Sequence, residues 1–213
     1  MSFQPESLVK AHDPEHRRAY VKKFYGMIEA GSYDQGEIPI LYLRAPIVYP
    51  VIDDSLVIKD NREEVWRYVS GSPSKITSKY FEDKPGKGSV IELTALDHVS
   101  IMKVTFPGYS SQARLVFDCR SFNFYGEEIP SYNKTIERID GQTWRIKADL
   151  IGEVAASAYV VIRFSEAFNA WGTFQIVDGT ESITPGSDSV SGEEVGFYVE
   201  YTSANVVEVL CSL

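Results

Sequence analysis

Hydrophobic and polar residues alternate with a period of two in many short runs after Ile38. In the run from Trp144 to Leu150 every second residue is apolar, and Arg145, Lys147 and Asp149 lie between them. Successive side chains of a strand point to opposite faces, so this period predicts strands with one buried and one wetted face. Similar runs cover Val90–Ala95, Val99–Phe106, Ala113–Cys119, Tyr159–Phe164, Thr173–Val177, Val195–Tyr201 and Val206–Cys211. The pattern predicts a mainly β domain.

Turn residues separate these runs and suggest how the strands pair. Asp140-Gly141 is a dipeptide that accepts the positive φ angles of a tight hairpin, so we predict antiparallel strands on either side of it. The run Tyr159–Ile162 is apolar on both faces, which indicates two stacked sheets or a sheet with another layer over it. Residues 178–194 are rich in Gly, Ser and acidic residues without a period, and we predict a solvated loop there.

The start of the chain has a different period. Asp13 is a suitable helix cap, Pro14 suits the first helical position, and Gly31 lies just past the predicted end. Between them an apolar stripe recurs at three- and four-residue spacing and comprises Tyr20, Val21, Phe24, Met27 and Ile28. We therefore predict one helix within residues 1–31, packed on the sheets.

Composition narrows the classes of ligand. The 213 residues carry a formal net charge of -9, which would repel a phosphate backbone or an anionic lipid surface, so we expect neither nucleic acid nor membrane as a partner. No apolar run approaches the roughly 20 residues that a membrane-spanning helix needs. The length suits one undivided β domain over residues 1–213.

The two cysteines and the chain ends leave several readings open. Cys119 and Cys211 lie in apolar runs, where either two buried thiols or a bridge between them would fit, and no spacing typical of a metal site is present. Residues 1–10 lack the pattern of a secretion signal. Because the chain stops within a strand-like run, we expect it to be a piece of a longer protein.

No catalytic residue can be assigned from motifs, because the phosphate loop, the nucleophile elbow and the zinc-protease signature are all missing from the sequence. His98 follows Asp97 between two predicted strands. It could act as a general base that Asp97 orients, or it could simply occupy a turn. Glycoside hydrolysis needs two opposed carboxyl groups, and sequence spacing alone does not reveal such a pair.

Aromatic residues make up 13% of the chain, and flat sugar faces stack on aromatic rings. Trp144 falls in the buried register of its strand and is predicted to be structural. Trp171, with Asn169 beside it in a predicted turn, and Trp66, before a Ser/Gly/Pro-rich stretch, are candidate carbohydrate contacts. A structural role in the core or a turn is the alternative for Trp171 and Trp66.

The segment from residue 86 to 122 reads GKGSVIELTALDHVSIMKVTFPGYSSQARLVFDCRSF. It resembles the N-terminal β-domain of the calcium-dependent exo-α-mannosidases of glycoside hydrolase family 92, on the matches Leu93-Thr94-Ala95, His98, Lys103, Thr105-Phe106-Pro107 and the apolar run ending at Asp118. Residues 159–174 and 195–213 resemble later strands of that domain. The family's Gly-rich loop and Gly-Phe-Ser-His-like segment are not found before Lys79.

The resemblance implies an antiparallel β-supersandwich of the galactose-mutarotase type. It implies that the whole protein is an inverting exo-α-1,2-mannosidase whose catalytic groups and calcium ligands lie mainly on a C-terminal α/α-barrel. This chain would then be the noncatalytic domain that packs on that barrel and lines one wall of the sugar site, with His98 joining Trp66, Trp171 and Asn169 as carbohydrate contacts. Mannose-containing glycans and an extracellular or periplasmic location are implied in the same way.

Two other functions fit the residues. The chain could be an independent carbohydrate-binding module, which would bind sugar without a partner domain. It could also be a structural or adhesion sandwich without a sugar site. A large exposed apolar patch would favour the mannosidase domain, because separating two domains uncovers the surface between them.

Overall fold

The structure, a computed structural model, describes residues 20–21, 29–32, 41–44, 47–52, 56, 65–72, 75–81, 88–95, 99–108, 111–119, 133–150, 156–203 and 206–212. These residues form strands and the turns between them, without a helix. The strands are β1 (Tyr20–Val21), β2 (Glu29–Ser32), β3 (Leu41–Arg44), β4 (Ile47–Ile52), β5 (Val65–Ser72), β6 (Lys75–Phe81), β7 (Gly88–Ala95), β8 (Val99–Thr105), β9 (Ala113–Asp118), β10 (Asn133–Arg138), β11 (Thr143–Leu150), β12 (Ala156–Phe164), β13 (Ala170–Val177), β14 (Thr180–Pro185), β15 (Ser189–Gly192), β16 (Val195–Tyr201) and β17 (Val206–Ser212). Only the backbone is described for β1–β3, β5 and β6.

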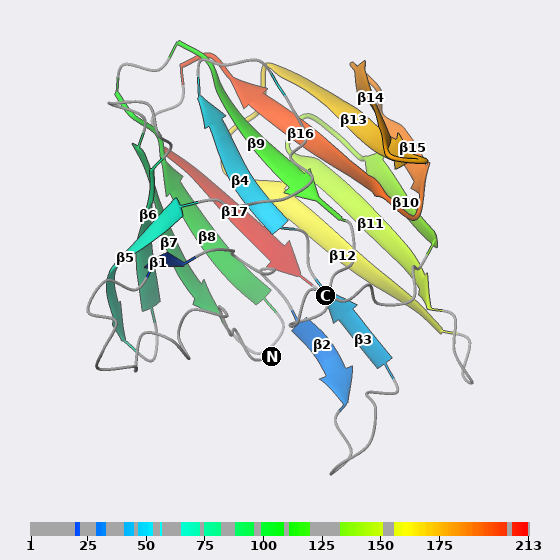
Figure 1. The fold of residues 1–213 in the computed structure, drawn as a ribbon, viewed down its shortest axis with the longest axis horizontal. Helices are drawn as coiled ribbons and strands as arrows, with labels where there is room; N and C mark the ends of the chain where they lie inside the picture. The colour runs from blue at the N-terminus through cyan, green and yellow to red at the C-terminus, as the bar shows by residue number, and fades with distance from the viewer. Residues whose placement is uncertain are drawn as a thin grey trace.

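The described strands form two facing sheets and a separate hairpin (Figure 1). The large sheet has ten strands in the order β1-β5-β6-β7-β8-β17-β12-β11-β10-β15, and the small sheet has five in the order β14-β13-β16-β9-β4. β2 pairs only with β3 among the described strands. Each pairing is antiparallel, so the prediction of an antiparallel double sheet is confirmed.

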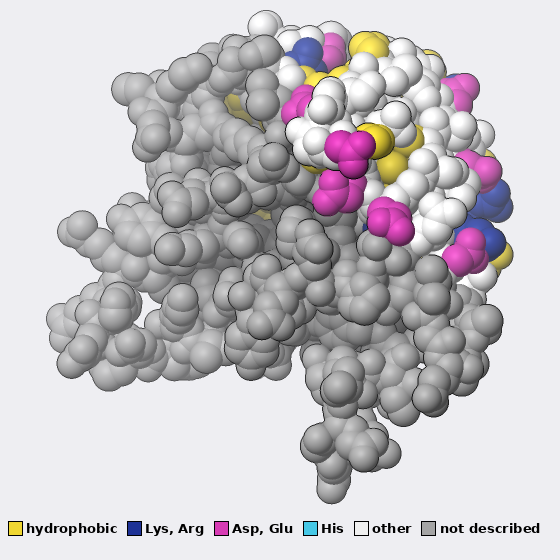
Figure 2. Space-filling model, turned by 45° about the vertical axis from the view of Figure 1, so that its right-hand side comes forward, with side chains coloured by type: hydrophobic (Ala, Val, Ile, Leu, Met, Phe, Trp, Pro, Cys, Tyr) yellow, Lys and Arg dark blue, Asp and Glu magenta, His cyan; other side chains and the backbone are white. Residues whose placement is uncertain are grey.

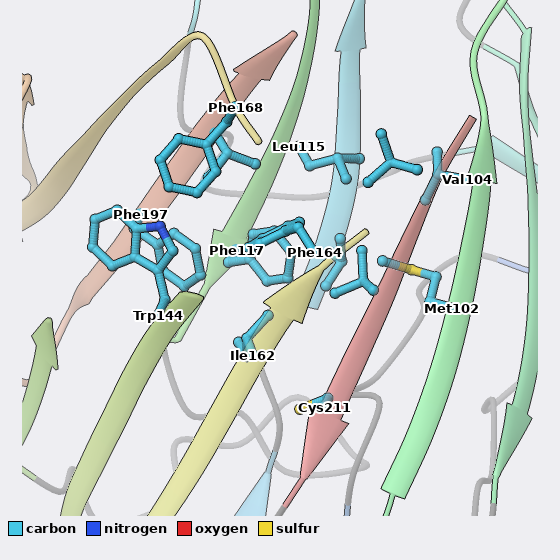
Figure 3. Close-up of a cluster of buried hydrophobic side chains, with 14 of the residues drawn as sticks. Met102, Val104, Leu115, Phe117, Trp144, Ile162, Phe164, Phe168, Phe197 and Cys211 are labelled. Carbon is cyan, nitrogen blue, oxygen red and sulfur yellow. The ribbon is translucent and has the colours of Figure 1, made fainter. Parts of the chain in front are cut away.

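The core lies between the two sheets and is built around stacked aromatic rings (Figure 3). Phe197 lies between Phe117, its cross-strand partner, and Trp144 of the opposite sheet, with ring centroids 4.6 and 4.4 Å apart. The edge of Phe164 meets Phe117 at 5.5 Å, and Phe164 in turn meets Phe168 at 5.9 Å. Since Trp144 is 0% exposed, the prediction that it is structural is confirmed.

The small sheet is buried on both faces at its centre. A second apolar cluster lies on its outer side and consists of Val51, Val116, Phe174, Ile176 and Tyr198. Gly196 lies within this cluster, where an added Cβ would come 2.1 Å from Cζ of Phe174. A side chain at this position would displace the ring, so glycine is required by the close packing of Phe174. The prediction of strands covered on both faces therefore holds for β9 and β16.

The prediction of a helix within residues 1–31 is wrong for the residues of that segment that the structure describes. Tyr20–Val21 forms β1, which pairs with Trp66 and Arg67 of β5, and Glu29–Ser32 forms β2. Tyr and Val suit a pleated strand, and pairing with a distant strand outweighs a local helical stripe. The remaining residues of the predicted helix lie outside the described part.

Two turns also differ from their predictions. The hairpin at Asp140-Gly141 is present, but the turn is held by the Asp140 carboxylate, which accepts the Gln142 N–H at 2.7 Å, and Gly141 has no positive φ. The predicted loop 178–194 instead contains β14 and β15. A second Asp-Gly pair is the sequence feature that indicates this hairpin. Asp178 and Gly179 have φ of 51° and 72° and join β13 to β14 in a tight turn.

Replacing Phe197 by Ala should cost about 3–5 kcal/mol of unfolding free energy, because it removes the ring that joins the two sheets. Phe197→Leu should cost less, since more of the volume is kept. Val177→Thr, at a position 57% exposed, should stay within about 0.5 kcal/mol of the parent. Urea denaturation measures all three, and equal losses at Phe197 and Val177 would contradict the stacked core.

Candidate functional site

Three side chains meet where the two sheets join at the β10–β15 edge. The guanidinium carbon of Arg138 lies 4.1 Å from the ring centroid of Trp171, which is the distance of a cation–π contact. Asp188 Oδ1 accepts a hydrogen bond from Arg138 Nε at 2.6 Å and another from Trp171 Nε1 at 2.9 Å. We call Arg138, Trp171 and Asp188 the rim cluster.

The backbone holds the rim cluster in place from both sheets. Arg138 ends β10 of the large sheet, Trp171 belongs to β13 of the small sheet, and Asp188 lies just before β15. The Arg138 N–H donates to the Asp188 carbonyl at 2.7 Å, and the Gly186 N–H donates to the Trp171 carbonyl at 2.7 Å. Gly186 has a φ of 71°, so the turn after β14 needs the left-handed conformation that glycine adopts without strain.

The rim cluster keeps polar atoms at the surface. The Asp188 side chain is 59% exposed and uses Oδ1 to accept both of these hydrogen bonds, so Oδ2 takes no part in them. Arg138 is 21% exposed and uses Nε, while its terminal amino groups make no hydrogen bond to another described residue. The hydrogen bond from Arg138 lowers the pKa of Asp188, so this carboxylate is ionised at neutral pH.

Asn169, the polar neighbour of Trp171 in the sequence, has a structural contact of its own. Its Oδ1 accepts from the Thr202 N–H at 2.8 Å and from the Thr202 hydroxyl at 3.0 Å. These bonds tie the turn before β13 to the end of β16. Asn169 is exposed, and its amide nitrogen is the group that remains for a ligand.

Of the four predicted carbohydrate contacts, Trp171 and Asn169 have side chains within the described part of the structure. Trp66 lies in β5 and pairs with Tyr80, but its side chain is outside the description. His98 is itself outside the described residues, between the paired ends of β7 and β8. β5 and β10 are seven strand spacings apart in the large sheet, or roughly 33 Å along it. Trp171 and Asn169 therefore belong to a different part of the molecule from Trp66.

A buried lysine lies at the other end of β10 from Arg138. Lys134 is 4% exposed, and its Nζ donates to the Glu193 carbonyl at 2.6 Å. Burial lowers the pKa of Lys134, and the neighbouring Cys119, Glu193 and Glu194 oppose that shift. The contact ties β10 to the turn between β15 and β16, which is a structural role.

The cysteines are two separate buried thiols, and no disulfide joins them. Of the two readings left open by the sequence, the buried thiols are confirmed. Burial raises the pKa of Cys211 to about 12, so this thiol stays protonated and unreactive at neutral pH.

The charge around the rim cluster favours a neutral ligand over an anionic one. After Arg163 the sequence has no Lys, Arg or His, and its acidic residues are Glu166, Asp178, Glu181, Asp188, Glu193, Glu194, Glu200 and Glu208. Acidic side chains spread over the described part of the face in Figure 2, and Lys and Arg lie at its margins. These acidic side chains would repel a phosphorylated or sulfated ligand.

The described residues contain neither a metal-ligand cluster nor a membrane-crossing helix. No group of three His, Cys, Asp or Glu side chains in the described ranges could hold a metal ion. Within those ranges there is also no helix with the length and apolarity of a membrane crossing.

Arg138 and Asp188 are the residues that sequence reasoning missed. Arg138 is the last residue of a strand of ordinary alternation, and Asp188 lies in the segment predicted as loop. The two are 50 positions apart, so their contact depends on the pairing of β10 with β15. A period of two in one strand carries no information about that pairing.

Comparison with known proteins agrees with the fold. A family model described as the glycosyl hydrolase family 92 N-terminal domain matches residues 25–212. Solved structures of an inverting GH92 mannosidase and of a GH92 alpha-mannosidase in complex with mannoimidazole, both from Bacteroides thetaiotaomicron, match with TM-scores of 0.58 and 0.59 at 13% identity. No curated protein matches in sequence.

These matches cover most of this chain but only a small part of the mannosidase chains. They cover 90% and 89% of this chain but only 27% and 28% of the two mannosidase chains. A further structure of the second enzyme gives the same result, with 92% of this chain, 29% of that chain and a TM-score of 0.59. The chain thus spans less than a third of the length of the enzymes that it resembles in fold.

Asp188→Asn should lower the urea midpoint at pH 7, and the difference from the parent should shrink at pH 3. The folded-state pKa of Asp188 is below its usual value, so its contribution is fully present above about pH 4 and is lost as the pH falls through the folded pKa. Asp178→Asn, without such partners, is the control. A difference that is the same at both pH values would contradict the ionised contact with Arg138.

Proposed function

The chain belongs to glycoside hydrolase family 92, as its N-terminal domain, and from this we propose that it is the noncatalytic domain of a longer exo-α-1,2-mannosidase. In this proposal it packs on a helical catalytic domain and supplies one wall of the sugar site. The observation that carries the proposal is the unequal coverage: this chain accounts for 27–29% of the length of the mannosidases that share its fold.

The partner domain would supply the chemistry. Hydrolysis with inversion needs a carboxylic acid and a carboxylate on opposite sides of the scissile bond. We assign both groups, and the calcium that the family resemblance implies, to the partner domain, where that resemblance places them. We also propose an extracellular or periplasmic setting, where mannose-containing glycans are found.

The rim cluster is the proposed sugar contact that the geometry supports best. Arg138 and Phe168 contact the indole of Trp171, and the part of its apolar surface that stays exposed can take the C–H face of a sugar. Asp188 Oδ2 and the Arg138 amino groups can form charge-assisted hydrogen bonds with hydroxyl groups beside it. Asn169 adds an amide donor nearby, and Trp66 and His98 remain proposed contacts on a separate part of the domain.

The 213-residue chain alone should release no more product from an aryl α-mannoside or from mannobiose than a buffer control. The longer protein encoded by the same gene should hydrolyse both, because it contains the acid and base. Turnover by the chain alone would sink the noncatalytic assignment. A gene that encodes no further domain, together with tight mannose binding by calorimetry, would favour the independent binding module.

Mannose or mannobiose should shift the indole N–H signal of Trp171 in a two-dimensional NMR spectrum, because its Nε1 is bonded within the rim cluster. The buried Trp144 indole is the internal control and should stay in place. Asp188→Asn should weaken the response severalfold, and Asp178→Asn should not, since only Asp188 contacts the ring. An unmoved Trp171 signal at saturating sugar would make the rim cluster purely structural.

A further inference from the structure

The outward face of the large sheet carries apolar side chains where strand alternation normally places polar ones. Tyr159 and Val161 of β12 are 50% and 41% exposed, and Leu210 of β17 is 39% exposed. The neighbouring strand β11 shows the ordinary pattern, because its outward positions are Arg145 and Lys147. The prediction from sequence that Tyr159–Ile162 is covered on both faces therefore holds only for the inward residues, Val160 and Ile162.

The register joins these residues into one patch. Leu210 pairs with Ile101 of β8 on one side and with Arg163 of β12 on the other, and Val161 lies on the same face two residues before Arg163. β12, β17 and β8 are neighbours in the large sheet, so the patch is two strand spacings, or about 10 Å, wide. We call Tyr159, Val161, Leu210 and Ile101 the outer patch. Single exposed apolar residues are ordinary, whereas a contiguous group marks an interaction surface.

Charged residues surround the outer patch, and most of them are already paired. Three cations have carboxylate partners, namely Lys103 with Glu92, Arg145 with Glu137 and Lys147 with Asp149. Arg163 lies directly beside Leu210, and its charge acts electrostatically on Asp140, whose pKa it helps to lower. An apolar centre with a charged rim is the usual anatomy of an interface.

We propose that the outer patch is the surface on which the helical catalytic domain of the same polypeptide docks. The inference rests on the proposed function and adds the contact surface to it. Apolar side chains of a helical layer would cover Tyr159, Val161 and Leu210. The patch is the centre of this interface, and its charged rim supplies the rest of the area that an interdomain contact of about 600–1,500 Å² needs.

One observation favours this occupant over a second copy of the chain. Ser212 pairs with Val161, so polypeptide that follows Ser212 in a longer protein starts at the patch itself and reaches a docked domain without a long linker.

Cysteine alkylation tests the proposal, because both natural thiols are buried and react slowly. Val161→Cys and Leu210→Cys report on the patch, and Val177→Cys, at a position 57% exposed on β13, is the matched control. Each variant is made in the 213-residue chain and in the longer protein from the same gene. Its rate of reaction with N-ethylmaleimide is measured by mass spectrometry, after circular dichroism shows that the variant is folded.

The two patch cysteines should react at least about tenfold more slowly in the longer protein than in the chain, and Val177→Cys should react equally in both. Fast alkylation of the patch in a longer protein that still hydrolyses mannosides would overturn the docking surface and leave the proposed function standing. Slow alkylation in the chain alone, with sedimentation as a dimer, would assign the patch to a second copy. A gene without a further domain would overturn both.

Discussion

The contact between the inward faces of the two sheets is the constraint on which this molecule depends. Phe197 makes this contact most directly, because its ring stacks on Phe117 of its own sheet and on Trp144 of the other. The rings bury large apolar areas and prefer a few relative orientations, so they set the separation of the layers as well as stabilising it. This separation also sets the positions of the turns and edges that surround the core, including the rim cluster.

The rim cluster shows how the edge of such a sandwich can present a site. Arg138 comes from the large sheet and Trp171 from the small one, and Asp188 bonds to both. A ligand at this edge would meet groups that the core already holds, so little side-chain entropy would be lost on binding. The acidic surroundings of the cluster fit a neutral sugar.

The two faces of the large sheet have separate roles in the proposed assembly. Its inward face builds the core, while the outer patch is apolar in spite of its exposure. Within the folded chain this exposure has no benefit, because each exposed apolar residue forgoes burial that would stabilise it. The arrangement is explained when a second domain covers the patch, as expected for a family whose solved members are more than three times as long as this chain.

The sequence by itself determined the local features. Alternation predicted most strands from Val90 to Cys211, although not β14 and β15, together with the buried register of Trp144 and the burial of both thiols. The motifs of residues 86–122 led to the correct family. Only the tertiary structure decided that Tyr20–Val21 joins β5 and that Arg138 meets Asp188. These contacts depend on strand order between distant segments, and the period of one strand is the same whichever strand lies beside it.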